Sequence, residues 1–159
     1  MEAAFLADIA ETVKSLTPKS GIRVVIRAEE DFLNETDSVC VIGTSFPHLP
    51  ASYILEAFGR LSQGRDCFVA GPTDEGGFYL AGASRGNSRA LLKEITRSTA
   101  NVFRETLQQA VMGDTAVSLL PSLQEMERLE HLRRLSRDLR RGVVIAPHTQ
   151  YFLRKIGYE

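Results

Sequence analysis

Short apolar runs alternate with longer amphipathic segments along this chain, and this alternation constrains its fold more than any other feature. Ser38–Gly43 is apolar on both faces, as expected of a strand in a sheet that helices cover on both sides. Further strands are predicted at Ile22–Ala28, Asp66–Gly71, Phe78–Ala83 and Ala116–Leu120. The alternation predicts an α/β three-layer sandwich with a mostly parallel central sheet. Ser38–Gly43 should be a central strand.

Helices are predicted where apolar residues recur every three or four positions. Near the start of the chain, Phe5, Ile9, Val13 and Leu16 mark one apolar face. The other predicted helices are 54–64, Asn87–Ile95, 102–110 and Leu123–Arg141, the longest. Gly142 is expected to end the last of them. Val143–Ala146 is then a strand-like run, and a short amphipathic segment follows Pro147.

Composition is that of an ordinary soluble globular protein. The chain is 43% hydrophobic and 25% charged, and its 159 residues suit a single domain, 1–159. A formal net charge of -1 gives no global attraction for nucleic acid or an anionic membrane. No apolar run approaches the ~20 residues that span a bilayer, so a cytoplasmic location is expected. Cys40 and Cys67 lie in apolar runs, which favours buried free thiols over a disulfide.

The arginine-rich part of the last predicted helix has two interpretations. Residues 133–141 include five arginines interleaved with Asp138, close to the predicted end of the helix. Cations complement the helix dipole there, so a solvated face is favoured over a nucleic-acid patch.

Gly71–Gly82 contains the clearest candidate site. Asp74 and Glu75 directly precede Gly76 and Gly77, in a turn between two predicted strands. Two adjacent carboxylates could coordinate a cation, accept hydrogen bonds from sugar hydroxyls or act as a general base. The same residues also fit an Asx-type turn of a surface hairpin with no function.

Two further loops are candidates, because ligands bind beyond the carboxyl ends of the strands in open α/β sheets. They are Thr44–Pro50 and the segment after Pro121. In the first, His48 could contact a phosphate or act as a base. The alternative is an exposed loop histidine without a role.

Several of these segments, taken in order, resemble the motifs of the DUF2064 family, a bacterial group similar to GT-A glycosyltransferases and to small nucleotidyltransferases. The segments are Val39–Pro50, Gly71–Gly82 and Arg97–Thr99 with Val102 and Thr106, and the resemblance extends to about Leu153. It implies a nucleotide-diphospho-sugar transferase-like fold. In GT-A enzymes, the acidic motif after the central strand holds a divalent cation against the diphosphate of a nucleotide-sugar.

The resemblance also implies roles for individual residues. Asp74 and Glu75 would be catalytic, and Glu125 and Glu127, which match an Asp-x-Asp motif, are candidate metal ligands. The residues implied in substrate binding are Ser45, His48, Gly76, Gly77, Arg97, Ser98 and Thr99. Ser45 stands where the family has the metal-type Asp, and a neutral hydroxyl is a weak ligand for Mg²⁺ or Mn²⁺. A divalent cofactor is therefore in doubt.

The sequence opens on a helix, whereas family members open with a strand and a nucleotide-binding loop that contains Lys or Arg and Gly. Buried backbone groups left unpaired beside a missing strand cost about 1–3 kcal/mol each. We therefore expect Val143–Ala146, or a strand supplied by a partner chain, to fill its place, and a homo-oligomer is one possible assembly. The alternative is a truncated sequence.

The function expected from the resemblance is glycosyl or nucleotidyl transfer. A cation or Arg97 would stabilise the leaving diphosphate, and Glu75 would orient or deprotonate the acceptor hydroxyl. Two alternatives stay open, a non-catalytic binding or oligomerising relative and another small-molecule-binding α/β protein.

Overall fold

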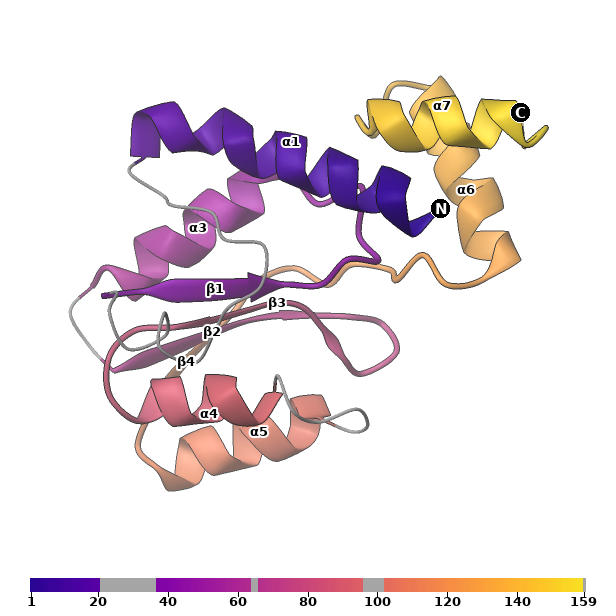
Figure 1. Ribbon diagram of the computed structural model, residues 1–159. Coiled ribbons are helices and arrows are strands. Elements are labelled where there is room, and N and C mark those ends of the chain that lie inside the picture. The colour runs from indigo at the N-terminus through magenta and orange to yellow at the C-terminus, as the bar shows by residue number, and fades with distance from the viewer. Residues whose placement is uncertain (21–36, 64–65, 96–101, 159) are drawn as a thin grey trace. The chain divides into compact units, whose positions relative to one another are not determined.

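The computed structural model describes residues 1–20, 37–63, 66–95 and 102–158 (Figure 1). The chain divides into two compact units, each assembled from segments far apart in the sequence. The first comprises Met1–Val24, Thr44–Ala51 and Gln124–Glu159, and the second comprises Val25–Gly43 and Ser52–Leu123. Within the described part of the chain, no helix has both the length and the apolar character needed to cross a membrane.

The second unit is built on a mixed sheet. Its strands are β1 (Val39–Ile42), β2 (Cys67–Pro72), β3 (Phe78–Ala83) and β4 (Ala116–Leu119), in the order β1-β3-β2-β4. β3 is antiparallel to β1 and β2, whereas β4 is parallel to β2. The prediction of a mostly parallel sheet is therefore wrong for these strands. The reason is that a tight hairpin connects β2 to β3, and such a connection joins only antiparallel strands.

β1 is the first strand in the order of the four described strands. That Ser38–Gly43 is a central strand stays a prediction, because a further predicted strand is not among these four. The strand predicted at Ile22–Ala28 lies outside the described residues. The strands predicted at Asp66–Gly71, Phe78–Ala83 and Ala116–Leu120 are confirmed to within two residues at each end.

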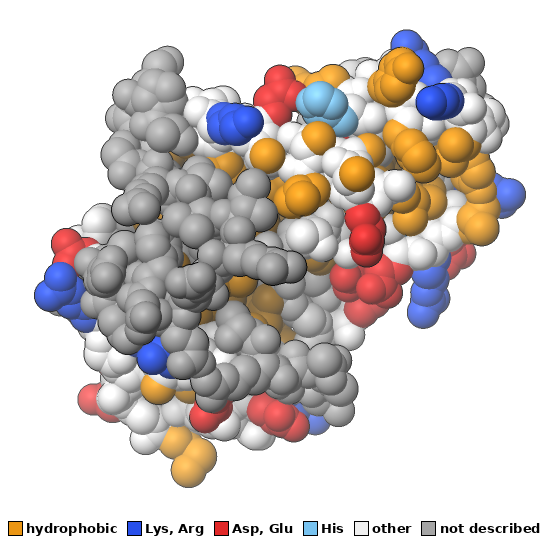
Figure 2. Space-filling model, viewed as in Figure 1, with side chains coloured by type: hydrophobic (Ala, Val, Ile, Leu, Met, Phe, Trp, Pro, Cys, Tyr) orange, Lys and Arg blue, Asp and Glu red, His pale blue; other side chains and the backbone are white. Residues whose placement is uncertain are grey.

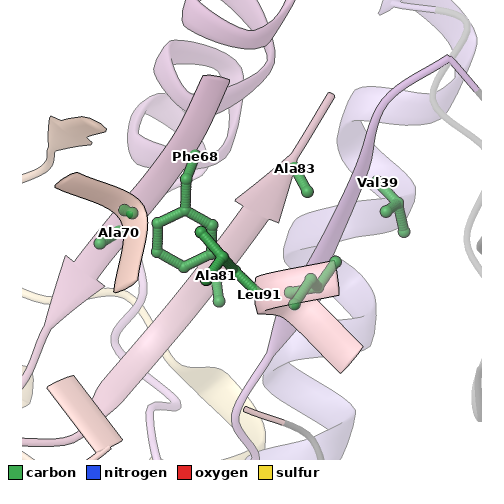
Figure 3. Packing of buried hydrophobic residues seen from close by; sticks show 8 residues of the cluster. Val39, Phe68, Ala70, Ala81, Ala83 and Leu91 are labelled. Atoms are coloured by element: carbon green, nitrogen blue, oxygen red, sulfur yellow. The ribbon is translucent and has the colours of Figure 1, made fainter. Parts of the chain in front are cut away.

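Helices cover both faces of this sheet (Figure 1). They are α3 (Ala51–Leu61) on one face, and α4 (Asn87–Ile95) and α5 (Val102–Met112) on the other. On the α4 side, Phe68, Ala81 and Leu91 belong to one buried cluster (Figure 3). The α/β character and the helix-covered sheet agree with the prediction for this unit.

Tyr79 determines which residue can stand at position 71. Tyr79 is fully buried, and its hydroxyl donates a hydrogen bond of 2.9 Å to the carbonyl of Pro121. Its ring centroid lies 6.2 Å from that of Tyr53 on α3. A Cβ at Gly71 would lie 2.4 to 2.8 Å from three ring carbons of Tyr79. Only glycine lets the strand pass this close to the ring.

The described residues of the first unit form α1 (Glu2–Ser20), α6 (Leu129–Arg140) and α7 (Pro147–Lys155). α1 buries the predicted apolar face of Phe5, Ile9, Val13 and Leu16. Phe5 joins Met126, Leu135 and Leu153 in a cluster of buried residues. This cluster is the hydrophobic core of the first unit.

A buried carboxylate on α1 caps α7. Asp8 is 2% exposed, and its oxygens accept hydrogen bonds from the backbone N–H groups of His148 (2.9 Å) and Thr149 (2.8 Å). The Thr149 hydroxyl donates a third bond, of 2.5 Å. The first N–H groups of a helix have no partner within the helix, and a carboxylate also complements the positive end of its dipole. Asp8 therefore provides the hydrogen-bond acceptors for the first N–H groups of α7, which lie about 140 residues further along the chain.

α6 begins later than predicted. The prediction placed its start at Leu123, but the helix begins at Leu129. The intervening backbone bonds elsewhere: Leu123 N–H donates to Pro72 O at 3.1 Å and Met126 N–H donates to Ser45 O at 3.1 Å. A segment committed to these non-helical bonds cannot form the i→i−4 bonds of a helix.

Val143–Ala146 is not the predicted strand but an irregular segment between α6 and α7. Gly142 has φ +69°, its N–H donates to Leu139 O, and the Val143 N–H donates to Asp138 O. This pattern is the Schellman motif that ends a helix, with glycine at the predicted position. Val143 and Ile145 are 72% and 86% exposed, so the run fills no place in the sheet. The amphipathic segment after Pro147 is confirmed as α7.

Replacing Gly71 tests the contact with Tyr79. We expect Gly71→Ala to lower the free energy of unfolding by about 1–3 kcal/mol, because the ring is fixed at its hydroxyl and cannot yield. Gly59→Ala on α3 is the matched control, since a Cβ there meets nothing within 4 Å. Alanine favours a helix over glycine, so the control should gain stability. Urea unfolding measures both, and equal effects would contradict the steric explanation.

Removing the Asp8 carboxylate tests the remote cap. We expect Asp8→Ala to cost about 1–3 kcal/mol of unfolding free energy, since two N–H groups and a hydroxyl lose their acceptor. Glu11→Ala removes an exposed carboxylate from the same helix and should change stability by less than about 0.5 kcal/mol. Thermal or urea unfolding of the two variants would show equal losses if Asp8 were not a cap.

Candidate functional site

The Thr73–Gly77 turn connects β2 to β3 through a three-residue loop. The Thr73 N–H donates to Gly77 O at 2.9 Å, and the Gly76 N–H donates to Thr73 O at 3.1 Å. Gly76 has φ +88°, the left-handed conformation that follows a type I turn in such hairpins. The Gly77 N–H also donates to the Thr73 hydroxyl at 2.9 Å. The backbone and Thr73 alone therefore close the turn.

Asp74 and Glu75 occupy the tip of this turn. Both side chains are exposed. Neither carboxylate has an ion-pair or hydrogen-bond partner among the side chains that the structure describes. Both are therefore available to a cation, a hydroxyl group or another donor from solution.

Residues after β4 support the turn from one side. The Asp74 N–H donates to Leu123 O at 3.4 Å, and Thr73 and Leu123 form a parallel bridge. Two residues earlier, Pro121 accepts the hydrogen bond from Tyr79. Burial, with smaller contributions from Tyr53 and Glu56, raises the pKa of the Tyr79 phenol well above its usual value. Tyr79 thus stays a neutral donor and holds the segment beside the acids.

Ser45, Glu125 and Glu127 belong to the first unit. The Ser45 carbonyl accepts the 3.1 Å hydrogen bond from Met126, the buried residue between the two glutamates. Ser45 and Glu125 are half-buried, whereas Glu127 is exposed. The backbone of Ser45 is therefore hydrogen-bonded to the 125–127 segment. Arg97, Ser98 and Thr99 lie outside the described residues.

His48 differs from the exposed loop residue that one interpretation favoured. It is half-buried, and its Nδ1 is buried without a hydrogen-bond partner in the described part of the chain. Burial lowers the pKa of the imidazole to about 4, an effect that the nearby Asp138 carboxylate partly opposes. The ring is therefore neutral near pH 7 and offers one donor and one acceptor in place of a positive charge.

One group of three metal-type side chains lies elsewhere in the described part of the chain, and it does not test the prediction for Glu125 and Glu127. Within the described ranges, the three metal-type side chains whose ligand atoms lie within 4.8 Å of one another are Asp8, Glu11 and His148. Asp8 already accepts three hydrogen bonds as the cap of α7, and Glu11 pairs with His148 Nε2 at 3.2 Å on the surface. The capping role of Asp8 and the surface contact between Glu11 and His148 explain this set. Glu125 and Glu127, with the neutral Ser45, offer two carboxylates, and Mg²⁺ is commonly held by one or two carboxylates together with substrate phosphates.

Two residues that stabilise the turn and the segment beside it, Thr73 and Tyr79, were not among the predicted site residues. Thr73 closes the turn with its hydroxyl, and Tyr79 holds Pro121. A threonine directly before Asp-Glu-Gly-Gly is a local signal, because Ser and Thr hydroxyls bond backbone groups within turns. Tyr79 carried no such signal, since its partner lies 42 residues away.

The free cysteines agree with the prediction. Cys40 and Cys67 are unpaired, with Cys67 buried and Cys40 half-buried. Burial raises the pKa of the Cys40 thiol to about 12. Burial also raises the pKa of Cys67, assisted by Asp66 and opposed by Arg60. Both thiols are therefore protonated and unreactive at neutral pH.

Comparison with known proteins identifies the family. The profile described as "Uncharacterized protein conserved in bacteria (DUF2064)" matches residues 10–99, more than half of the chain. The chain belongs to the DUF2064 family. The matched range contains Thr44–Pro50 and Thr73–Gly77, whereas Glu125 and Glu127 lie beyond it. No curated protein matches the sequence.

A solved structure supports the same relationship for this DUF2064 chain. A proposed nucleotide-diphospho-sugar transferase from Desulfovibrio desulfuricans G20, solved at 1.90 Å resolution, aligns with a TM-score of 0.64 and 25% identity. The alignment covers 79% of this chain and 54% of that protein, so this chain spans about half of its length. The predicted similarity to nucleotide-diphospho-sugar transferases is confirmed at the level of the fold.

The buried imidazole of His48 predicts a pH dependence of stability. Its folded pKa of about 4 lies below the ordinary value of 6.5, so the unfolded chain binds the proton first as the pH falls. Stability from this residue is complete above about pH 6.5 and is lost as the pH falls toward 4, by at most about 3 kcal/mol. Urea unfolding between pH 7 and 4.5 should show a steeper loss for the wild type than for His48→Gln. Parallel curves would contradict a buried neutral His48.

Proposed function

We propose that this chain binds a nucleotide-diphospho-sugar and transfers its glycosyl group to a hydroxyl acceptor. Glu75 is proposed to accept the acceptor's proton, with Asp74 beside it to orient the acceptor. His48, Ser45, Gly76, Gly77 and the Arg97–Thr99 segment are proposed to contact substrate. Because the chain spans about half of the length of its structural neighbour, this activity is proposed for the chain and not transferred from that protein.

One observation carries the proposal. Two exposed carboxylates without partners among the described side chains stand on a backbone-closed turn, in a fold similar to that of a proposed nucleotide-diphospho-sugar transferase. The turn is fixed by Thr73 and by the Leu123 segment, so the acids are presented on a rigid support. Catalytic groups act best where the scaffold holds them in position before the substrate arrives.

The proposed chemistry needs one base. The acceptor oxygen attacks the anomeric carbon, the bond from that carbon to the diphosphate oxygen breaks, and the electron pair leaves with the diphosphate. The hydroxyl proton passes to the Glu75 carboxylate. A single well-placed general base contributes about 10²–10⁴ in rate. No step requires a cation held by Ser45, whose hydroxyl is a weak ligand for Mg²⁺ or Mn²⁺.

A second candidate function is binding without turnover. It is favoured by Ser45, which stands where the family pattern has a metal-type carboxylate, and by the neutral state of His48. Loss of a charge-stabilising group typically costs about 10²–10³ in rate. A family member with such a change can keep its scaffold and its ligand while losing measurable catalysis.

Ligand panels and one matched pair of variants test the proposal. Thermal unfolding of the 159-residue chain should be measured with UDP-, GDP- and CDP-sugars and with NTPs, with and without Mn²⁺, while release of nucleoside diphosphate is followed in parallel. A ligand at 100 times its Kd adds about 2.7 kcal/mol of stability, which is readily seen as a higher Tm. We expect one nucleotide-sugar to raise the Tm and to be consumed.

Glu75→Gln should lower the rate of diphosphate release by at least about 10²-fold while leaving ligand-induced stabilisation nearly unchanged. Glu94→Gln is the control, because Glu94 is an exposed glutamate on α4. Stabilisation without consumption would support the binding-only function. A panel in which no nucleotide-sugar changes the Tm would contradict both.

A further inference from the structure

A hollow with a volume of about 560 Å³ lies in the first unit, beside α6 and the end of α7. It is lined by Arg133, Ser136, Arg137, Arg140, Gly157 and Tyr158. Figure 2 shows Lys and Arg side chains in blue around the region of α6 and α7. The volume falls within the range of about 300–1,000 Å³ that is typical of small-molecule sites.

Helical spacing brings the three arginines to one side of α6. Positions 133, 137 and 140 are separated by four and three residues, so their side chains project from the same face. The opposite face, with Leu132, Leu135 and Leu139, is buried in the core cluster. At a rise of 1.5 Å per residue, the arginine row is about 10 Å long, a length that two or three linked phosphate groups can match.

The second wall of the hollow is fixed by the end of α7. Gly157 has φ +76°, its N–H donates to Arg154 O at 3.1 Å, and the Tyr158 N–H donates to Leu153 O at 2.9 Å. This is again a Schellman motif. The Ser136 hydroxyl donates to Tyr158 O at 2.7 Å and ties that wall to α6. The Tyr158 side chain packs against the core cluster, so the hollow has rigid sides.

The charges of this row are not balanced by the described residues. Arg133, Arg137 and Arg140 form no ion pair within the described part of the chain, whereas Arg60 pairs with Glu56, Arg85 with Asp37 and Arg128 with Glu130. The helix dipole accounts for cations in the last turn of α6 but not for Arg133, which lies two turns from its end. An exposed, solvated helix face, which the sequence favoured for these arginines, also does not explain why three of them line a hollow.

We propose that this hollow binds a small molecule that carries two or more linked phosphate groups. Guanidinium groups bind phosphate oxygens through paired N–H donors, and a row of three provides for more than one phosphate. A single phosphate or sulfate would engage only part of the row. The proposal rests on α6 and α7 alone and does not depend on the Thr73–Gly77 turn.

Calorimetric titration of the whole chain tests the site, with pyrophosphate and tripolyphosphate as probes and orthophosphate and sulfate as comparisons. We expect the linked phosphates to bind at least about tenfold more tightly than orthophosphate, because each further charge-assisted hydrogen bond adds about one factor of ten. Equal binding of all four anions, or no binding of the linked phosphates, would overturn the proposal.

Variants locate the binding. Arg133→Gln, Arg137→Gln and Arg140→Gln combined should weaken pyrophosphate binding by at least about 100-fold. Arg134→Gln with Arg141→Gln removes two exposed charges, one on α6 and one at its C-cap, that do not line the hollow, and should change binding by less than about threefold. Glutamine and arginine have similar helix propensities, so both variants should fold, which circular dichroism verifies. An equal loss in the control would overturn a defined site.

Competition distinguishes a small ligand from nucleic acid. A single-stranded oligothymidylate should displace bound pyrophosphate only at micromolar or weaker affinity, with the steep salt dependence of non-specific binding. Tight displacement through the same three arginines would identify the hollow as part of a nucleic-acid surface and overturn the proposal.

Discussion

Within each of the two units, a carboxylate caps a helix that lies in a distant part of the chain. Asp8 on α1 accepts the first N–H groups of α7, and Asp66 before β2 accepts those of Asn87 and Ser88 at the start of α4. Each helix has nine residues, too short to be stable in isolation. Each cap satisfies polar groups and fixes the position where the helix begins. The local structure of α4 and α7 thus depends on contacts that close long loops.

Most helices and strands could be predicted from the sequence. The backbone hydrogen bonds of the segments between them could not. Apolar periodicity was sufficient for α1 and α4 because their buried faces repeat with the helical period. The same criterion failed at 123–128. Leu123 and Met126 are three residues apart, as on a helix face, but their backbone N–H groups donate to the carbonyls of Pro72 and Ser45. It failed again at Val143–Ala146, where β-branched residues suggested a strand although Gly142 ends the preceding helix. In both cases a backbone hydrogen bond decided the structure, and residue type does not reveal such bonds.

The candidate site shows the same limit. The Thr73–Gly77 turn was predictable because glycine marks the left-handed position of a tight hairpin. The mixed sheet that follows from this hairpin was not foreseen, since alternating strands and helices favoured parallel strands. The burial of His48 was also missed, because a loop position between Pro47 and Pro50 does not indicate which residues pack over it. Membership of DUF2064 and the likeness to a proposed nucleotide-diphospho-sugar transferase agree with the order of the motifs.

The hydrogen bonds that close the Thr73–Gly77 turn involve the backbone and one threonine hydroxyl, and neither acidic side chain. Any pair of polar residues would therefore fold into the same hairpin, and folding places no selection on the charge at positions 74 and 75. Among related sequences, the residues found at positions 74 and 75 would show which side chains the chemistry of the site requires. The residues found at Gly71 and Tyr79 would show which side chains the packing of the strands permits. The two kinds of evolutionary constraint are thus separated within the nine residues of one hairpin, from Gly71 on β2 to Tyr79 on β3.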